Sequence, residues 1–120
     1  MTIKPRRFHR ILTAAGGILA AAGVGLSAYA AHGAEAAARA NLQSAALFAL
    51  AHGIALAALS PHTPRRIGTL ALSMLLFGVL LFSGSLAAAH FFGVSTPLAP
   101  MGGSMILLGW LLFAADALRR

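Results

Sequence analysis

The chain has 120 residues, of which 59% are hydrophobic and only 9% are charged, and its mean hydropathy is +0.85. A soluble domain usually carries about 25% charged residues, so this composition excludes an ordinary water-soluble fold. The chain contains no cysteine, which excludes disulfides, iron–sulfur clusters and thiolate zinc sites. The net charge of +7 does not indicate nucleic-acid binding, because the basic residues flank apolar runs and form no patch with interleaved aromatic side chains.

The first apolar run, over about residues 11–31, follows a basic segment with Lys4, Arg6, Arg7 and Arg10. It is long enough to cross a membrane. Gly17, Ala21 and Gly25 recur at every fourth position and predict a face for close helix contact. The basic start, the apolar run and Ala28-Tyr29-Ala30 also fit a cleavable signal peptide. We favour a retained span, because such peptides carry a shorter apolar region.

The second span is predicted over about residues 43–60 and is rich in alanine. In the connection before it, Glu35 and Arg39 have i, i+4 spacing on a short interfacial helix, and Asn41 is the expected N-cap of the span. Ser60-Pro61 ends the helix, since proline cannot continue it. A second small-residue face is predicted along this span, formed by Ala45, Ala49, Gly53 and Ala57.

From Ile67 to Ala115 the chain has no Asp, Glu, Lys or Arg. A break at His90–Pro100 divides this stretch into two spans, over about residues 67–92 and 100–118. Thr63-Pro64 and Thr96-Pro97 are typical of an N-cap followed by proline at the first helical position. Gly84 and Ala88 are four residues apart and predict another contact face.

The distribution of Lys and Arg predicts the orientation of these spans. Basic residues lie at both termini and in the middle connection, whereas the connections after the first and third spans carry Arg39 alone. By the positive-inside rule, both termini and residues 61–66 face the cytoplasm, and His9 and His62 lie among lipid headgroups. We therefore predict an all-α polytopic membrane protein of the bacterial cytoplasmic (inner) membrane. Residues 1–120 form a single four-transmembrane-helix bundle, N-in and C-in.

His52 is the principal candidate for a functional residue, because it lies near the centre of the second span. An ionisable group in hydrocarbon is costly, and it suggests a proton relay, a haem ligand or a contact to a quinone-like ligand. The alternative is a neutral histidine that hydrogen-bonds across a helix interface to a serine or a carbonyl. We favour this structural interpretation, since the sequence offers no second ionisable partner at membrane depth.

Other polar residues are weaker candidates for a functional site. Ser83 and Ser85 are two residues apart and point to different faces, so packing explains them better than a shared site. Trp110 lies near mid-membrane, and its N–H is expected to meet a carbonyl freed by Pro97 or Pro100, or a serine of the third span. His32 and His90 lie near the outer ends of two spans and are weak candidates for a metal site, for which too few further ligands are available.

Four motifs occur in order along the chain: Ala30-Ala31-His32-Gly33, His52-Gly53-Ile54-Ala55-Leu56, Leu81-Phe82-Ser83-Gly84-Ser85-Leu86, and Pro100-Met101-Gly102-Gly103 with Gly109-Trp110. From about His32 to Phe113, the chain resembles the small membrane family called domain of unknown function 423. That family includes YgdD-like bacterial proteins and the animal transmembrane protein 256. The resemblance implies four helices and a membrane location, and it implies no activity.

The expected function is that of a non-enzymatic integral membrane protein without a cofactor, a structural or accessory component of a membrane complex or homo-oligomer. Its expected partners are the lipid bilayer and other membrane chains, not nucleic acid. Two alternatives remain open. One is a small-solute, proton or lipid pathway lined by His52, Ser83, Ser85 and Trp110. The other is a haem- or quinone-binding redox subunit with His52 as ligand.

Overall fold

The computed structural model describes residues 5–119, and within this range the chain forms four long α-helices. They are α1 (Pro5–His32), α2 (Ala36–Leu59), α3 (Arg66–Phe92) and α4 (Leu98–Arg119), and a short 3₁₀ turn, η1 (Ser60–His62), follows α2. Each predicted span falls on one of these helices, with Ser60 of the second span in η1, and each helix is long and apolar enough to cross a membrane. The 27 residues of α3 extend ~40 Å at 1.5 Å per residue, which exceeds the ~30 Å of hydrocarbon in a bilayer.

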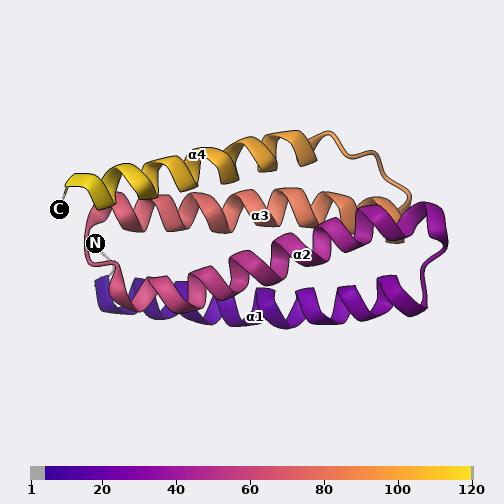
Figure 1. Ribbon diagram of the computed structural model, residues 1–120, viewed down its shortest axis with the longest axis horizontal. Coiled ribbons are helices and arrows are strands. Elements are labelled where there is room, and N and C mark those ends of the chain that lie inside the picture. Colours follow the sequence, from indigo (N-terminus) through magenta and orange to yellow (C-terminus); the bar gives the residue numbers. More distant parts are fainter. Residues whose placement is uncertain (1–4, 120) are drawn as a thin grey trace.

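The helices form two antiparallel hairpins that lie side by side (Figure 1). α1 packs closely on α2, α3 packs closely on α4, and the hairpins meet mainly through α2 and α3. The start of α1, the α2–α3 connection and the end of α4 lie at one end of the bundle, and the other two connections lie at the opposite end (Figure 1). The basic segments therefore share one end, which agrees with the predicted alternation of loops.

The first connection is shorter than the sequence suggested, because α2 already begins at Ala36. Arg39 lies in its first turns and donates to the carbonyl oxygens of Ala30 and Ala34, each at 3.2 Å. Ala30 lies in the last turn of α1 and Ala34 in the connection after it, so Arg39 caps the end of that helix instead of pairing with Glu35. The prediction that Asn41 caps the second span is wrong, since the alanine-rich segment before it continues the helix.

Local hydrogen bonds and a glycine determine where α2 and α3 end. Thr63 does not cap α3, which begins at Arg66; its hydroxyl donates to the Leu59 carbonyl at 2.7 Å and extends the end of α2. α3 ends at Gly93, whose φ of 69° is left-handed and whose N–H donates to the Ala89 carbonyl at 3.0 Å. Glycine adopts this conformation without a steric penalty, and the chain then turns towards α4.

Glycine brings α1 and α2 into backbone contact. A Cβ at Gly53 would lie 2.5 Å from the Ala20 nitrogen and 2.6 Å from the Gly16 oxygen. A Cβ at Gly16 would lie 2.6 Å from the Ala57 nitrogen. Gly53 and Ala57 of the predicted small-residue face therefore lie against α1, and Ala45 and Ala49 of that face are buried. Because lipid supplies little hydrophobic force between helices, such close van der Waals contact holds the hairpin together.

The contact face predicted on α1 is not the face on which α2 packs. A Cβ at Gly17 or Gly25 would meet nothing within 4 Å, and Ala21 is exposed. The face in contact is displaced around the helix and contains Gly16, Ala20 and Gly23. Small residues surround α1 on several sides, so spacing alone does not distinguish the face that α2 occupies.

In the second hairpin, glycine likewise brings the backbones of α3 and α4 into contact. A Cβ at Gly102 of α4 would lie 2.5 Å from the Phe82 nitrogen and 2.6 Å from the Gly78 oxygen of α3. The face predicted from Gly84 and Ala88 is wrong as a close contact, since a Cβ at Gly84 would meet nothing within 4 Å and Ala88 is only half-buried. Apolar side chains from all four helices fill the space between the hairpins, with Leu12, Leu56, Leu72, Leu75, Val79 and Ile106 as the buried cluster.

Candidate functional site

His52 lies on the buried side of α2, next to the glycine that contacts α1, and only 8% of it is exposed. Its Nδ1 is 2.9 Å from the Phe48 carbonyl oxygen one turn earlier in the same helix. Its Nε2 is 3.0 Å from the indole Nε1 of Trp110 on α4. Both ring nitrogens therefore have partners within the chain.

These partners determine the protonation state of the imidazole. A carbonyl oxygen only accepts and an indole N–H only donates. Nδ1 must therefore carry the hydrogen that Phe48 accepts, and Nε2 must be the unprotonated acceptor for Trp110. This is a neutral imidazole with both nitrogens satisfied, and its partner across the helix interface is Trp110, where the structural interpretation expected a serine or a carbonyl. A proton added at Nε2 would place two N–H groups against each other and break the bond to Trp110.

Trp110 is brought to His52 by the packing of α4 on α3. A Cβ at the preceding Gly109 would lie 3.0 Å from the Leu75 Cδ2 and 3.2 Å from the Ala71 oxygen, so glycine allows this close approach. Trp110 is 37% exposed and turns its N–H inward. The expected partner, a freed carbonyl or a serine of the third span, is wrong. No local pattern indicates the observed pair, because its members are 58 residues apart.

Aromatic rings pack against one side of the histidine. The Phe48 ring stacks on His52 at 5.6 Å between centroids and 15° between planes. Phe48 also contacts Phe82 of α3, with centroids 4.6 Å apart. From the sequence, a contact between Phe48 and His52 could be expected, because Phe48 lies one turn before His52. Nothing in the sequence indicates that Phe82 joins them.

The two serines of α3 have different surroundings. The Ser83 hydroxyl is buried and donates to the Ala45 carbonyl of α2 at 2.8 Å, which links the two hairpins. Ser85 lies on another, half-buried face of α3. Ser83 therefore belongs to the α2–α3 contact, and the two serines do not form one site.

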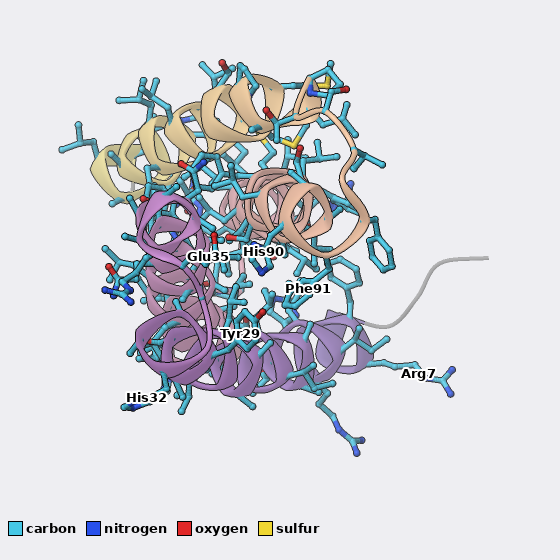
Figure 2. The ribbon with its side chains drawn as sticks, turned by 90° about the vertical axis from the view of Figure 1, so that its right-hand side faces the viewer. Arg7, Tyr29, His32, Glu35, His90 and Phe91 are labelled. Carbon is cyan, nitrogen blue, oxygen red and sulfur yellow. The ribbon has the colours of Figure 1, made fainter. Side chains whose placement is uncertain are left out.

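At the end opposite the basic segments, the weak metal candidates His32 and His90 do not face each other. The His90 Nε2 is 3.0 Å from the Tyr29 hydroxyl, and their rings meet edge to face with centroids 5.6 Å apart. The exposed His32 points away from His90 (Figure 2). Among residues 5–119 no group of three or more His, Cys, Asp or Glu side chains is placed to hold a metal ion. His32 and His90 therefore lie apart, each in its own surroundings.

The basic end contains an ion pair. Asp116 on α4 is 3% exposed, and its Oδ1 is 3.2 Å from the Nε of Arg65, which precedes α3. Gly68 leaves the room for this carboxylate, since a Cβ there would lie 2.9 Å from Oδ2. The contact is ionic without hydrogen-bond alignment at Oδ1, and it joins the adjacent ends of α3 and α4.

Four antiparallel apolar helices, with polar groups paired inside the bundle, define a polytopic α-helical membrane protein. The family described as "Protein of unknown function (DUF423)" matches residues 26–103. A relative from Haemophilus influenzae, described as "UPF0382 membrane protein", is 37% identical over 99 residues, covering 76% of this chain and 80% of the relative. The chain belongs to this family of membrane proteins of unknown function. No solved structure matches it.

Proposed function

We propose that this protein is a non-enzymatic structural or accessory component of a membrane complex or homo-oligomer in the bacterial cytoplasmic (inner) membrane. The observation that carries the proposal is the pairing of polar groups at membrane depth. His52 accepts from Trp110 and donates to Phe48, and Ser83 donates to Ala45. These side chains join helices, as hydrogen bonds between membrane helices commonly do.

The arrangement of carboxylates supports a non-catalytic role. The chain has two acidic residues, Glu35 and Asp116. Glu35 is exposed in the turn before α2, and Asp116 pairs with Arg65 near the end of α4. Asp116 is six residues beyond Trp110, or ~9 Å along the helix axis. A serine nucleophile or histidine base needs an orienting acid beside it, and neither carboxylate is placed for this at His52.

The redox alternative is less well supported by the same geometry. A haem iron would bind a histidine nitrogen that lacks a hydrogen, which here is Nε2. That atom already accepts from Trp110. An optical spectrum of the purified protein tests this directly: a Soret band that disappears in His52→Gln would establish a haem subunit in place of the proposed role.

Affinity purification in a mild detergent tests the leading proposal. Two copies of the chain, each with a different tag, are co-expressed and one tag is captured. We expect the second copy or a distinct membrane protein to co-elute in a constant ratio, and an unrelated four-helix membrane protein to capture neither. Elution as a single copy in several mild detergents and after cross-linking in the membrane would contradict the proposal.

Cysteine labelling tests the location and orientation. Because the chain has no native cysteine, single cysteines report cleanly. His62→Cys is expected to be blocked only by reagents with access to the cytoplasm, and Ala37→Cys and Ser95→Cys by external reagents. All three positions are exposed, whereas the neighbouring Thr63 is buried and unsuitable. Ile54→Cys, which is exposed in the middle of α2, should resist charged reagents. External labelling at residue 62 would reverse the N-in assignment.

A further inference from the structure

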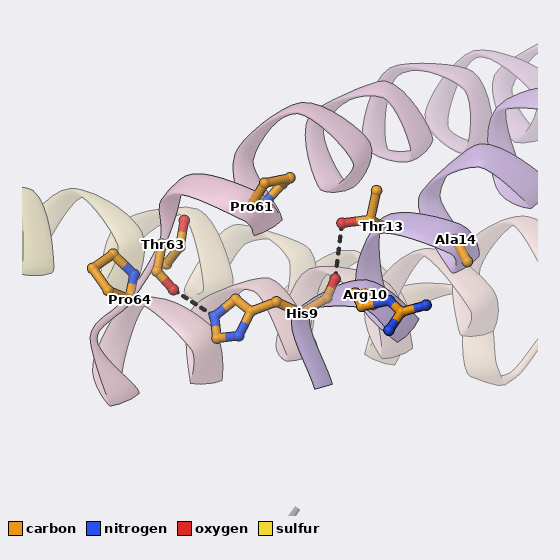
Figure 3. Close-up of a pocket in the computed structure, with 7 residues that line it drawn as sticks. All are labelled: His9, Arg10, Thr13, Ala14, Pro61, Thr63 and Pro64. Carbon is orange, nitrogen blue, oxygen red and sulfur yellow. Dashed lines mark hydrogen bonds between the residues drawn. The ribbon is translucent and has the colours of Figure 1, made fainter. Parts of the chain in front are cut away.

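A cavity of about 750 Å³ opens at the basic end of the bundle, between the first turns of α1 and the connection that follows α2 (Figure 3). His9, Arg10 and Ala14 of α1 line one side. Pro61, Thr63 and Pro64 line the other. The cavity is separate from the His52–Trp110 pair, which lies deeper in the bundle on α2 and α4.

Hydrogen bonds hold the two walls together. The His9 Nε2 contacts the Thr63 carbonyl oxygen and lies 3.1 Å from the Thr69 Oγ1 (Figure 3 shows the former). Because a carbonyl oxygen only accepts, Nε2 carries a hydrogen and donates. Thr69 in turn donates to the Arg65 carbonyl at 2.9 Å, which leaves its lone pairs free to accept from His9. The start of α1 is thus fastened to the α2–α3 connection, and the cavity is preformed.

The chemistry of the walls suits an anion with an apolar portion. Arg10 is exposed and lines the cavity, and a guanidinium carries five N–H donors in a planar fork that matches phosphate oxygens. Pro61 and Pro64 have no backbone N–H and form an apolar surface. Arg7 in the first turn of α1 and Arg66 at the start of α3 are also exposed and add positive potential at this end of the bundle. Basic pockets between membrane helices on the cytoplasmic side are typical binding places for anionic headgroups.

Next to the cavity, the exposed face of α1 is apolar. Ala14, which lines it, is exposed, and Ile18 and Ala21 follow at i+4 and i+7 on the same exposed face of α1. A free phosphate ion would use none of this apolar surface. We infer that the cavity binds an anionic phospholipid of the cytoplasmic leaflet. Arg10 pairs with the headgroup phosphate, and an acyl chain lies along Ala14 and Ile18.

Lipid-dependent melting of the purified protein tests this site. Phosphatidylglycerol or phosphatidylcholine is added to the full chain in detergent, and bound lipid is counted by native mass spectrometry. We expect phosphatidylglycerol to raise the melting temperature more than phosphatidylcholine and to remain bound as one molecule per chain. In Arg10→Gln the affinity for phosphatidylglycerol should fall about fivefold, which is the effect of one basic side chain near the membrane surface.

Two further variants test whether phosphatidylglycerol binds at this cavity. Ala14→Phe fills the cavity without changing the charge and should also weaken binding of phosphatidylglycerol. Arg119→Gln removes an exposed arginine from the end of α4 that does not line the cavity, and it should leave binding unchanged. Residues 10 and 14 are exposed, so both substitutions should preserve the melting temperature in the absence of lipid. Equal loss in Arg10→Gln and Arg119→Gln, or normal binding in Ala14→Phe, would overturn the site. An equal effect of inorganic phosphate would overturn the assignment to a lipid.

Discussion

Gly53→Leu is expected to separate α1 from α2 and to lower the melting temperature in detergent by about 10 °C. The leucine side chain would begin 2.5 Å from the Ala20 nitrogen and 2.6 Å from the Gly16 oxygen, where only backbone atoms of α1 are available to move. Overpacking of this kind costs about 3 kcal/mol, and a domain of this size loses roughly 4 °C for each kcal/mol. Thermal melting with size-exclusion chromatography in the same detergent measures the effect.

Two leucine substitutions on other faces serve as controls. Ala58→Leu lies on an exposed face of α2, and Gly17→Leu lies where a Cβ meets nothing within 4 Å. Both should keep the melting temperature of the wild type. If all three variants melt alike, the small residues of α2 reflect an alanine-rich composition and do not hold the hairpin. A Gly17→Leu variant that melts normally but elutes as a smaller particle would place a contact between chains on the outer face of α1.

The second prediction is that His52 and Trp110 stabilise the bundle through their hydrogen bond. His52→Leu and Trp110→Phe should each destabilise the bundle, and the double variant should be less destabilised than the sum of the two. Hydrogen bonds between membrane helices give a coupling of about 0.6 kcal/mol on average and up to ~1.7 kcal/mol. Since both nitrogens of the imidazole are used, we expect a value near the upper end. A double-mutant cycle measured by unfolding in detergent provides the number.

Two readouts accompany this cycle. Trp110 is the single tryptophan of the chain, so its fluorescence reports directly on the bond. Its emission should shift in His52→Leu and should be retained in His52→Gln, because an amide still offers an oxygen to the indole N–H. His32→Gln, at an exposed position, is the control and should change neither quantity. Additive destabilisation with unchanged emission would show that the two residues do not depend on each other. Loss of a cellular phenotype in a correctly folded His52→Gln variant would favour a proton pathway instead.

The face of α2 that packs on α1 was predictable, and the face of α1 that packs on α2 was not. In α2 the small residues lie along one line, with large exposed side chains at Leu47 and Ile54 elsewhere on the helix. In α1 the two candidate faces differ by one residue, Gly16 against Gly17, and both are rich in small side chains. The rotation of α1 about its axis depends on how its backbone fits α2, and spacing within one helix contains no information about this fit.

At the histidine site, too, the sequence predicted one half of the interaction and not the other. The position of His52 within an apolar span predicts a polar group that needs partners inside the bundle. The partner across the bundle is set by the depth and rotation of α4, which depend on the approach of Gly109 to Leu75 and of Gly102 to Phe82. Trp110 then reaches His52 from the other hairpin.

The sequence by itself determined the four spans and their alternating orientation. A bilayer imposes these features along the chain, through the length of apolar runs and the placement of arginines between them. Only the tertiary structure decided which glycines carry the contacts, that Arg39 caps α1, and that His52 is a neutral acceptor for Trp110. The reason is physical: hydrocarbon selects apolar segments one at a time, whereas helix rotation and hydrogen-bond pairing depend on the shapes of two surfaces fitted together.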